Sequence, residues 1–149
     1  MSPTDHYRSL ERMYAAAPLN MAFYHPTMTV GEGKATIEMV LAEHHHHSAG
    51  AAHGSVYFKM LDDAAFFAAN SLEHETFVLT SSFTTYLLRP VVQGTLRSEG
   101  RVVNIGRSQF IAESVLYDEK GREVGRGNGV FVKGRTPLAE ATGYGPPAP

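Results

Sequence analysis

The sequence contains no cysteine. This absence excludes disulfide bonds, thiolate metal sites and cysteine nucleophiles, and it suits a reducing compartment. Long hydrophobic runs are also absent, since the longest apolar stretch, around residues 64–69, is far too short to span a bilayer. Residues 1–20 are polar and mixed in charge, without the apolar segment of a secretory signal. From these absences we expect a soluble cytoplasmic protein with no membrane partner.

The chain carries little net charge, −2 at pH 7, and its Lys and Arg residues are scattered along the sequence. A protein without a basic patch has no strong electrostatic attraction to nucleic acid or to a membrane surface, so we expect neither as a partner. Apolar sequence is plentiful: 43% of the 149 residues are hydrophobic and 19% are charged. This length and composition predict one globular domain with a core of its own.

The spacing of apolar residues predicts two helices and six strands. In residues 5–16, Leu10, Met13 and Tyr14 share one face, which predicts a short helix with a buried side. The sequence GEG predicts a hairpin between residues 24–30 and 34–41, and the turn sequences NIGR and DEKGR imply two further antiparallel hairpins. The predicted strands, which show alternation or β-branched and aromatic residues, cover residues 24–30, 34–41, 77–88, 94–103, 108–117 and 123–133.

The second predicted helix runs from His53 to Ser71 and is apolar around most of its circumference. A helix of this kind is central to a fold and does not lie on its surface. A curved antiparallel sheet wrapped around one buried helix satisfies both periodicities, so we expect an α+β fold. Such a sheet leaves edges that must be covered or paired, and a dimer that joins edges is the simplest solution.

The C-terminal part of the chain is rich in glycine and proline. In the last predicted strand Gly125, Gly127 and Gly129 alternate, which indicates close approach by another element or strong curvature. From Pro137 on, the sequence PLAEATGYGPPAP favours a loose segment. We therefore expect one domain over residues 1–136 and a flexible tail over residues 137–149.

Three stretches of the sequence resemble a known family. The segment HGSVYFKMLDDAAFFAANS is similar to the His-Gly-Gly…Asp segment of hotdog-fold thioesterases, in particular the PaaI-like, phenylacetate-type acyl-CoA thioesterases. TSSFTTYLLRPVVQGTLRSEGRVVNIGRS and DEKGREVGRGNGVF resemble the strands that follow in that family, so the resemblance covers roughly residues 21–133. It implies the hotdog fold, a curved sheet around one long central helix. It also implies dimers, often paired into tetramers, with active sites at the dimer interface.

Two adjacent aspartates lie inside the apolar helix, where a carboxylate is costly unless it is paired or used. Aligning His53 and Gly54 with the family's His-Gly pair puts Asp62 at the catalytic carboxylate. Asp63 lies four residues after Lys59, at the spacing of a helical salt bridge, although Lys59 could also reach Asp62. We expect Asp62 to attack a thioester carbonyl or to take a proton from water. The alternative is that both aspartates lie on a solvated helix face.

Gly54 and Ser55 lie at the predicted start of the central helix, where backbone N–H groups are unpaired and the helix dipole favours negative charge. They are candidates to stabilise an oxyanion, although Gly and Ser also suit a plain helix start. Gly54 and Asp62 are eight residues apart, about 12 Å along a helix axis. One thioester carbon cannot contact both within one chain. If both are catalytic, two central helices must lie antiparallel in a dimer.

Three further positions gain candidate roles from the resemblance. His47 occupies the position of a frequent Asn that helps to orient the carbonyl or the water, and a His can donate the same hydrogen bond or act as a base. His53 is expected to fix the loop through a hydrogen bond. Thr80, ten residues before Pro90, matches a Ser or Thr that faces the site and can hold the attacking water. Each could instead be an ordinary loop or strand residue.

The substrate requires further side chains around the reacting centre. Guanidinium groups suit phosphate geometry, and Arg89 and Arg107 are our candidates for the coenzyme A phosphates. His53 and Ser55 are expected beside the substrate. Aromatic side chains suited to an aryl or medium acyl chain are expected to line the acyl pocket, namely Tyr57, Phe58, Phe66 and Phe83.

A run of four histidines covers residues 44–47. Neighbouring side chains point to opposite faces in a strand and splay in a loop, whereas metal ligands must converge. We therefore expect adventitious metal binding at most from His44, His45 and His46, and no functional metal.

These features predict an acyl-CoA thioesterase that releases a free acid and coenzyme A, with no cofactor beyond the coenzyme A of its substrate. A non-catalytic hotdog protein that binds an acyl ligand or serves in assembly is the main alternative, which His47 and Ser55 support as departures from the family pattern. The hydratase branch of the fold needs an Asp and a His in the loop before the helix, and that loop carries no Asp. A metalloprotein built on the His cluster is the remaining alternative.

Overall fold

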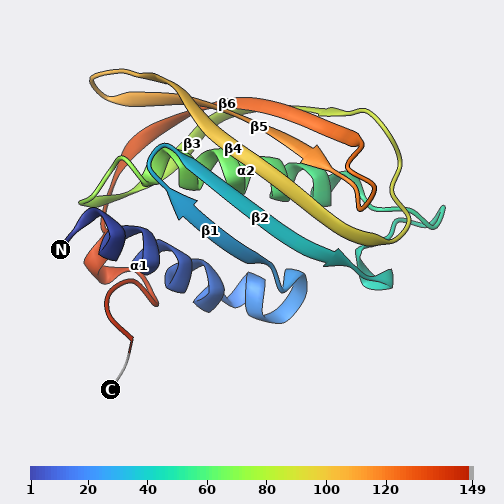
Figure 1. The fold of residues 1–149 in the computed structure, drawn as a ribbon, viewed down its shortest axis with the longest axis horizontal. Coiled ribbons are helices and arrows are strands. Elements are labelled where there is room, and N and C mark those ends of the chain that lie inside the picture. The colour runs from blue at the N-terminus through green and yellow to red at the C-terminus, as the bar shows by residue number, and fades with distance from the viewer. Residues whose placement is uncertain (148–149) are drawn as a thin grey trace.

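In the computed structural model, which describes residues 1–147, one antiparallel sheet curves around a long helix (Figure 1). The helices are α1 (Pro3–Ala16) and α2 (Gly54–Asn70). Short helical turns cover Asn20–Tyr24, Glu43–His45 and Leu138–Glu140. The strands are β1 (Thr27–Gly31), β2 (Lys34–Leu41), β3 (Thr76–Leu87), β4 (Gly94–Ile105), β5 (Gln109–Tyr117) and β6 (Glu123–Pro137).

The six strands lie in the order β1-β2-β4-β5-β6-β3, and every neighbouring pair is antiparallel. The three predicted hairpins are present as β1–β2, β4–β5 and β5–β6. α2 lies against the concave face of the sheet, and most of its side chains are buried there. The predicted α+β architecture is therefore confirmed. Among residues 1–147, no helix has the length and apolarity that crossing a membrane requires.

The N-terminal helix begins two residues earlier than predicted. The Ser2 hydroxyl accepts a hydrogen bond from the Asp5 backbone N–H, and the Asp5 carboxylate accepts one from the Ser2 N–H, both at 3.1 Å. This capping box, with a proline at the first helical position, stabilises the helix start. The face predicted to be buried is indeed buried, since Leu10, Met13 and Tyr14 are at most 5% exposed.

The first strand begins later than predicted, at Thr27. Residues 20–24 form a π-helical turn that ends at His25 in the left-handed region, with φ of 51°. This turn reverses the chain after α1 and brings the Phe23 and Tyr24 rings into edge contact, 4.8 Å apart. Tyr24 therefore packs inside the fold as part of a turn, and the predicted strand loses its first three residues.

The two edges of the sheet differ. At the β1 edge, Arg8 of α1 donates to the Val30 carbonyl at 2.8 Å, and the Val30 N–H donates to Glu11 at 2.9 Å. α1 therefore satisfies part of that edge. At the other edge, β3 pairs with β6 and with no other strand of residues 1–147, and its Leu79 and Tyr86 side chains are 52% and 53% exposed. A long edge strand with exposed apolar side chains is a surface for pairing.

The glycine stripe of β6 allows the close approach that its pattern predicts. A Cβ atom on Gly127 or Gly129 would lie 2.5 Å from the Phe83 ring of β3, and one on Gly125 would lie 3.3 Å from the Tyr57 ring. Only glycine leaves room for these rings to lie against the strand.

The C-terminal segment departs from the flexible tail expected at residues 137–149. Leu138 is 1% exposed. Farther on, the Tyr144 hydroxyl lies 2.7 Å from His6 Nδ1 and Arg12 Nε donates to the Gly145 carbonyl at 2.7 Å. Apolar burial and these hydrogen bonds hold the segment against α1. The last two residues of the expected tail, 148–149, lie outside the described residues.

Candidate active site

Asp62 lies in the middle of α2, and β3 supplies its hydrogen-bond donor. The Thr80 hydroxyl donates to Asp62 Oδ1 at 2.9 Å. Register irregularities interrupt β3 on both sides of this residue, between Thr76 and Val78 and between Thr80 and Ser82. Bulges of this kind re-aim side chains and are common beside active sites. Thr80 thus contacts Asp62, and its place in the site and its part in the chemistry stay predictions.

Two aromatic pairs flank this contact along the antiparallel seam between α2 and β3. Phe58 and Phe83 have ring centroids 5.8 Å apart, and Phe66 and Phe77 have theirs 5.1 Å apart. Phe58 and Phe66, the members of these pairs that belong to α2, lie one turn before and one turn after Asp62. The carboxylate is therefore set between aromatic rings, an arrangement that limits its contact with water. No local sequence pattern pairs β3 with α2, so this seam was not predicted.

Burial raises the pKa of Asp62 from 3.8 to about 6, while the hydrogen bond from Thr80 opposes the rise. The neighbouring Asp63 raises this pKa further, and Lys59 lowers it. A carboxylate with a pKa near 6 is mostly ionised at neutral pH and is still a better proton acceptor than an ordinary aspartate.

Asp63 is occupied by other partners. Lys59 Nζ lies 2.6 Å from Asp63 Oδ2, and the Tyr14 hydroxyl donates to the same oxygen at 2.8 Å. The ammonium group also lies 5.1 Å from the centroids of the Tyr14 and Tyr24 rings. Burial raises the pKa of Asp63, and the ion pair with Lys59 opposes that rise. The predicted Lys59–Asp63 pair is confirmed. The alternative that both aspartates lie on a solvated helix face is wrong, since the Asp63 side chain is only 16% exposed.

At the start of α2, the backbone N–H of Gly54 is left free by the described part of the chain, while that of Ser55 is bonded. His53 is the N-cap of α2, and its Nδ1 accepts a hydrogen bond from the Ser55 N–H at 3.0 Å. This is the fixing role predicted for His53, and it removes the Ser55 N–H from the candidate oxyanion donors. The Gly54 N–H has no acceptor within residues 1–147.

The structure brings several predicted residues together at this helix start. A pocket of about 300 Å³, here called the α2 N-terminal pocket, is lined by His47, Gly54, Tyr57 and Arg89, with Leu87 and Leu88 of the β3 end. His47 Nδ1 accepts from the Ala49 N–H at 3.0 Å, which holds its ring in the loop. The Tyr57 hydroxyl donates to the Arg89 carbonyl at 2.7 Å.

The four aromatic residues predicted to line one acyl pocket do not do so. Tyr57 lines the α2 N-terminal pocket, and Phe58 is 45% exposed beside Phe83. Phe66, nine residues after Tyr57, lines a separate pocket of about 210 Å³ between α1 and α2, here called the α1–α2 pocket. Helix periodicity identifies which residues share a face, but it does not place them at the same height. Tyr57 and Phe66 are nine residues apart, about 13 Å along the helix axis.

The His run has a structural role. Nε2 of His44 and Nε2 of His45 each lie 2.9 Å from the Phe23 carbonyl, and His46 Nε2 lies 2.7 Å from the Val92 carbonyl. These contacts tie the loop to its neighbours. Within residues 1–147, no group of three or more His, Asp or Glu side chains is arranged to hold a metal ion.

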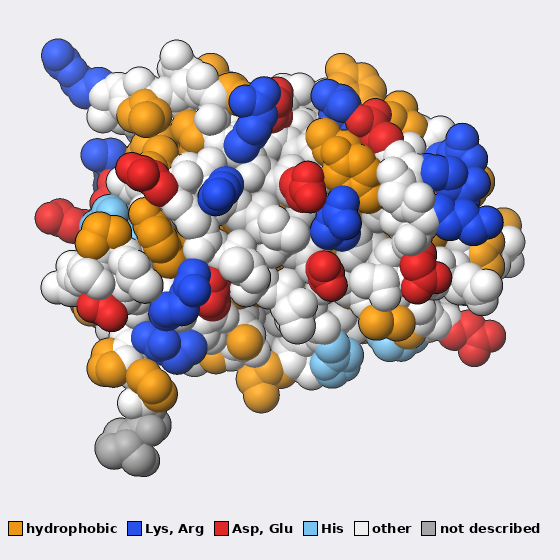
Figure 2. Space-filling model, viewed as in Figure 1, with side chains coloured by type: hydrophobic (Ala, Val, Ile, Leu, Met, Phe, Trp, Pro, Cys, Tyr) orange, Lys and Arg blue, Asp and Glu red, His pale blue; other side chains and the backbone are white. Residues whose placement is uncertain are grey.

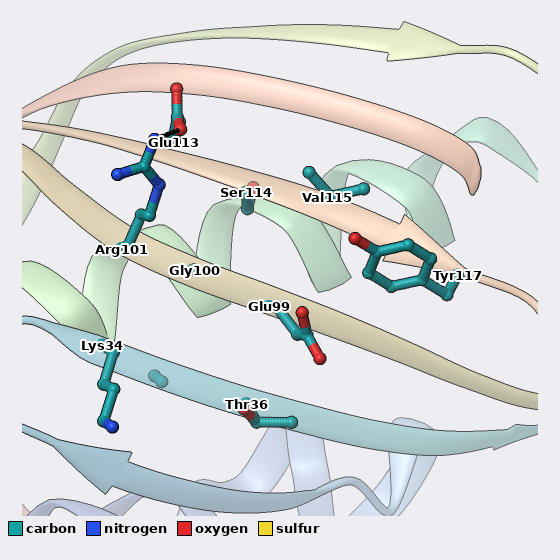
Figure 3. Close-up of a pocket in the computed structure, with 10 residues that line it drawn as sticks. Lys34, Thr36, Glu99, Gly100, Arg101, Glu113, Ser114, Val115 and Tyr117 are labelled. Atoms are coloured by element: carbon teal, nitrogen blue, oxygen red, sulfur yellow. Dashed lines mark ion pairs between the residues drawn. The ribbon is translucent and has the colours of Figure 1, made fainter. Parts of the chain in front are cut away.

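The arginines do not gather into a phosphate site. Arg89 lies at the α2 N-terminal pocket, whereas Arg107 is exposed in the turn between β4 and β5. On the outer face of the sheet, a hollow of about 370 Å³ contains Arg101, which pairs with Glu113 at 2.6 Å (Figure 3). Charges of both signs are interspersed over this face (Figure 2). The assignment of Arg89 and Arg107 to coenzyme A phosphates stays a prediction.

Comparison with known proteins identifies the family. The sequence matches the model of the thioesterase superfamily over residues 49–125, more than half of the chain. The chain belongs to the thioesterase superfamily. No curated protein matches this superfamily member.

Solved structures share its fold at low sequence identity. The PaaI protein of the E. coli phenylacetic acid degradation operon has a TM-score of 0.81 and 19% identity, over 91% of this chain and 97% of that one. A thioesterase family protein from Silicibacter pomeroyi has a TM-score of 0.77 and 24% identity, over 88% and 97%. A thioesterase from Haemophilus influenzae has a TM-score of 0.73 and 16% identity, over 85% and 88%. The fold is thus that of the PaaI-like hotdog thioesterases, as the sequence resemblance predicted.

Proposed function

We propose that this superfamily member is an acyl-CoA thioesterase that acts as a homodimer, alone or paired into a tetramer. The observation that carries the proposal is the state of Asp62. Its carboxylate is partly buried, it receives one hydrogen bond from Thr80, and its pKa is raised to about 6. The nearby cation, Lys59, forms its ion pair with Asp63. Asp62 is therefore available as a base or nucleophile near neutral pH.

In the general-base form of the reaction, Asp62 takes a proton from water as the water oxygen bonds to the thioester carbonyl carbon. The carbonyl electron pair moves onto its oxygen, and that oxyanion accepts a hydrogen bond from a backbone N–H. Collapse of the intermediate breaks the C–S bond, and the sulfur takes the proton from Asp62 as it leaves. In the nucleophilic form, Asp62 itself bonds to the carbonyl carbon, the thiolate leaves, and water hydrolyses the mixed anhydride. Coenzyme A is part of the substrate, and neither form requires another cofactor.

The proposed oxyanion donor is the N–H of the partner's Gly54. Gly54 is the first residue of α2 and Asp62 the ninth, so about 12 Å separates them along one helix. Two α2 helices in antiparallel contact would bring the free N–H of one chain to the carboxylate of the other. The unpaired edge of β3, with its exposed apolar side chains, supports an interface on this side of the fold. In this arrangement Arg89 of the partner subunit would lie near the coenzyme A arm.

The first experiment measures free thiol release from acyl-CoA thioesters of short, long and aryl acyl groups. We expect turnover by the parent protein, and Asp62→Ala should remove most of it while the dimer stays folded. Equal turnover by Asp62→Ala would rule out the assignment of Asp62. No turnover of any thioester would instead favour a non-catalytic protein that binds an acyl ligand.

A second experiment tests the Gly54 N–H alone. Proline is favoured at the first position of a helix, and His53 already has the extended backbone that a following proline requires, with φ of −64° and ψ of 149°. Gly54→Pro should therefore keep the helix and delete the donor, which lowers kcat by about 100-fold or more. Gly54→Ala keeps the N–H, adds a Cβ 3.4 Å from Leu87, and serves as the control. If the two variants lose activity equally, the Gly54 N–H is not the donor.

A further inference from the structure

The α1–α2 pocket lies immediately beside the proposed reacting carboxylate. Phe66, in its wall, is four residues after Asp62 and therefore one helical turn, about 5.4 Å, farther along α2. Phe77, also in its wall, is three residues before Thr80, the hydrogen-bond donor to Asp62. The contact between the two rings follows the contact between Asp62 and Thr80 along the same seam. A group attached to a carbonyl at Asp62 can reach this pocket within a few bonds.

The lining of the pocket suits an uncharged apolar group. Met13, Ala17 and Leu19 line it from the N-terminal segment, opposite the aromatic rings. The charged side chains that reach it, Lys59 and Asp63, are paired with each other at 2.6 Å. An apolar ligand would therefore be buried without leaving a new unpaired charge, and its transfer from water would favour binding.

The volume of the pocket limits what it can hold. A buried apolar cavity of roughly 150 Å³ is enough for benzene. At about 210 Å³, the α1–α2 pocket holds one aromatic ring with a small substituent, or a chain of comparable volume, but has no room for a long fatty acyl chain.

We propose that the acyl group of the thioester binds in the α1–α2 pocket, and that the N-terminal segment, through Ala17 and Leu19, limits the substrates to short-chain and single-ring acyl groups. This proposal rests on the proposed function, because it takes Asp62 as the reacting group.

The test changes the size of the pocket from the N-terminal segment. Ala17→Leu adds volume inside the pocket, and Ala15→Leu adds the same side chain to the exposed face of α1 as the matched control. With acetyl-, hexanoyl-, benzoyl- and decanoyl-CoA, the parent should show its highest kcat/KM for the hexanoyl or benzoyl group. Ala17→Leu should lower kcat/KM for these two by about tenfold or more and leave acetyl-CoA unchanged. Ala15→Leu should match the parent.

Leu19→Ala enlarges the α1–α2 pocket instead of filling it. Leu19 is 55% exposed, so its replacement should affect folding little. It should raise kcat/KM for decanoyl-CoA relative to hexanoyl-CoA. If Ala17→Leu and Leu19→Ala change all four substrates by the same factor, or change none, the acyl group binds elsewhere and the proposal is overturned.

Binding measurements separate this proposal from the proposed function. Benzyl-CoA thioether carries a ring but no cleavable carbonyl, and calorimetry measures its affinity without turnover. If the parent binds this thioether about tenfold more tightly than coenzyme A, and Ala17→Leu removes the gain, the pocket assignment stands even in a protein that hydrolyses nothing. If the parent hydrolyses thioesters and Ala17→Leu leaves the gain intact, the proposed function stands and the pocket assignment fails.

Discussion

Replacing Asp62 by Asn should stabilise the protein above neutral pH while removing its activity. Burial raises the pKa of Asp62 from 3.8 to about 6 in the folded chain, so the folded state binds the proton more tightly than the unfolded state. The stability that this group contributes therefore falls as the pH rises from about 4 to about 6, and it is constant above that range. At about 1.36 kcal/mol per pKa unit, the shift corresponds to roughly 3 kcal/mol, which partial exposure of the carboxylate reduces to about 1–2 kcal/mol.

Urea unfolding of the parent and of Asp62→Asn, at one protein concentration, measures this effect. The variant should exceed the parent by about 1–2 kcal/mol at pH 8 and by almost nothing near pH 3.5, where both side chains are neutral. Asn is close to Asp in shape and still offers an oxygen to the Thr80 hydroxyl, so packing should cancel in the comparison. Glu119→Gln, at an exposed turn residue, is the control for general charge removal. A stability difference that is the same at both pH values would refute the reasoning.

Three further predictions concern the same neighbourhood. The acid limb of the kcat/KM profile against pH should have an apparent pKa near 6, the value for Asp62. The hydrogen bond from Thr80 lowers this pKa in the parent, so Thr80→Val, which removes the bond, should raise the pKa and move the limb to higher pH. Thr80→Ser, which keeps a hydroxyl, should leave the limb where it is. Lys59→Met should cost about 3–5 kcal/mol in urea unfolding, since it leaves Asp63 buried without its cation, and the double variant Lys59→Met/Asp63→Leu should regain most of the loss. Gly127→Ala should cost about 1–3 kcal/mol by thermal or urea unfolding, because its Cβ would lie 2.5 Å from an aromatic ring of β3; a variant as stable as the parent would contradict the close packing described here.

Much of the fold follows from periodicity within single elements. The apolar circumference of residues 53–71 predicts a central helix, and alternation together with turn sequences predicts the hairpins that the structure contains. The position of β3 was not predicted, because its pairing with β6 joins residues far apart in sequence. Its approach to the sheet was nevertheless indicated indirectly by the glycine stripe of β6. The start of α1 could also have been read from the spacing of Ser2 and Asp5, which is that of a capping box.

The site divides in the same way between local and distant contacts. The Lys59–Asp63 pair depends on spacing along one helix, and it was predicted from that spacing alone. The hydrogen bond from the Tyr14 hydroxyl to Asp63 was not predicted, since it joins α1 to α2 and no local sequence pattern relates the two helices. The Ser55 N–H was predicted to be a candidate oxyanion donor, but it is bonded to His53. Helix starts have several free N–H groups, and the sequence does not say which of them the N-cap side chain will use.

The two aspartates show how α1 supports a carboxylate that it does not touch. Asp63 receives the Lys59 ammonium and the Tyr14 hydroxyl, so the cation that could otherwise stabilise the charge on Asp62 is held at its neighbour. If α1 were removed, Asp63 would lose the Tyr14 donor and gain water, and Lys59 would lose one of the two aromatic rings that flank it. The ammonium could then turn toward Asp62, and its charge would lower the pKa of that carboxyl. Since the raised pKa of Asp62 is what suits it to accept a proton, the N-terminal helix contributes to the proposed chemistry through electrostatics as well as through the wall of the proposed acyl pocket.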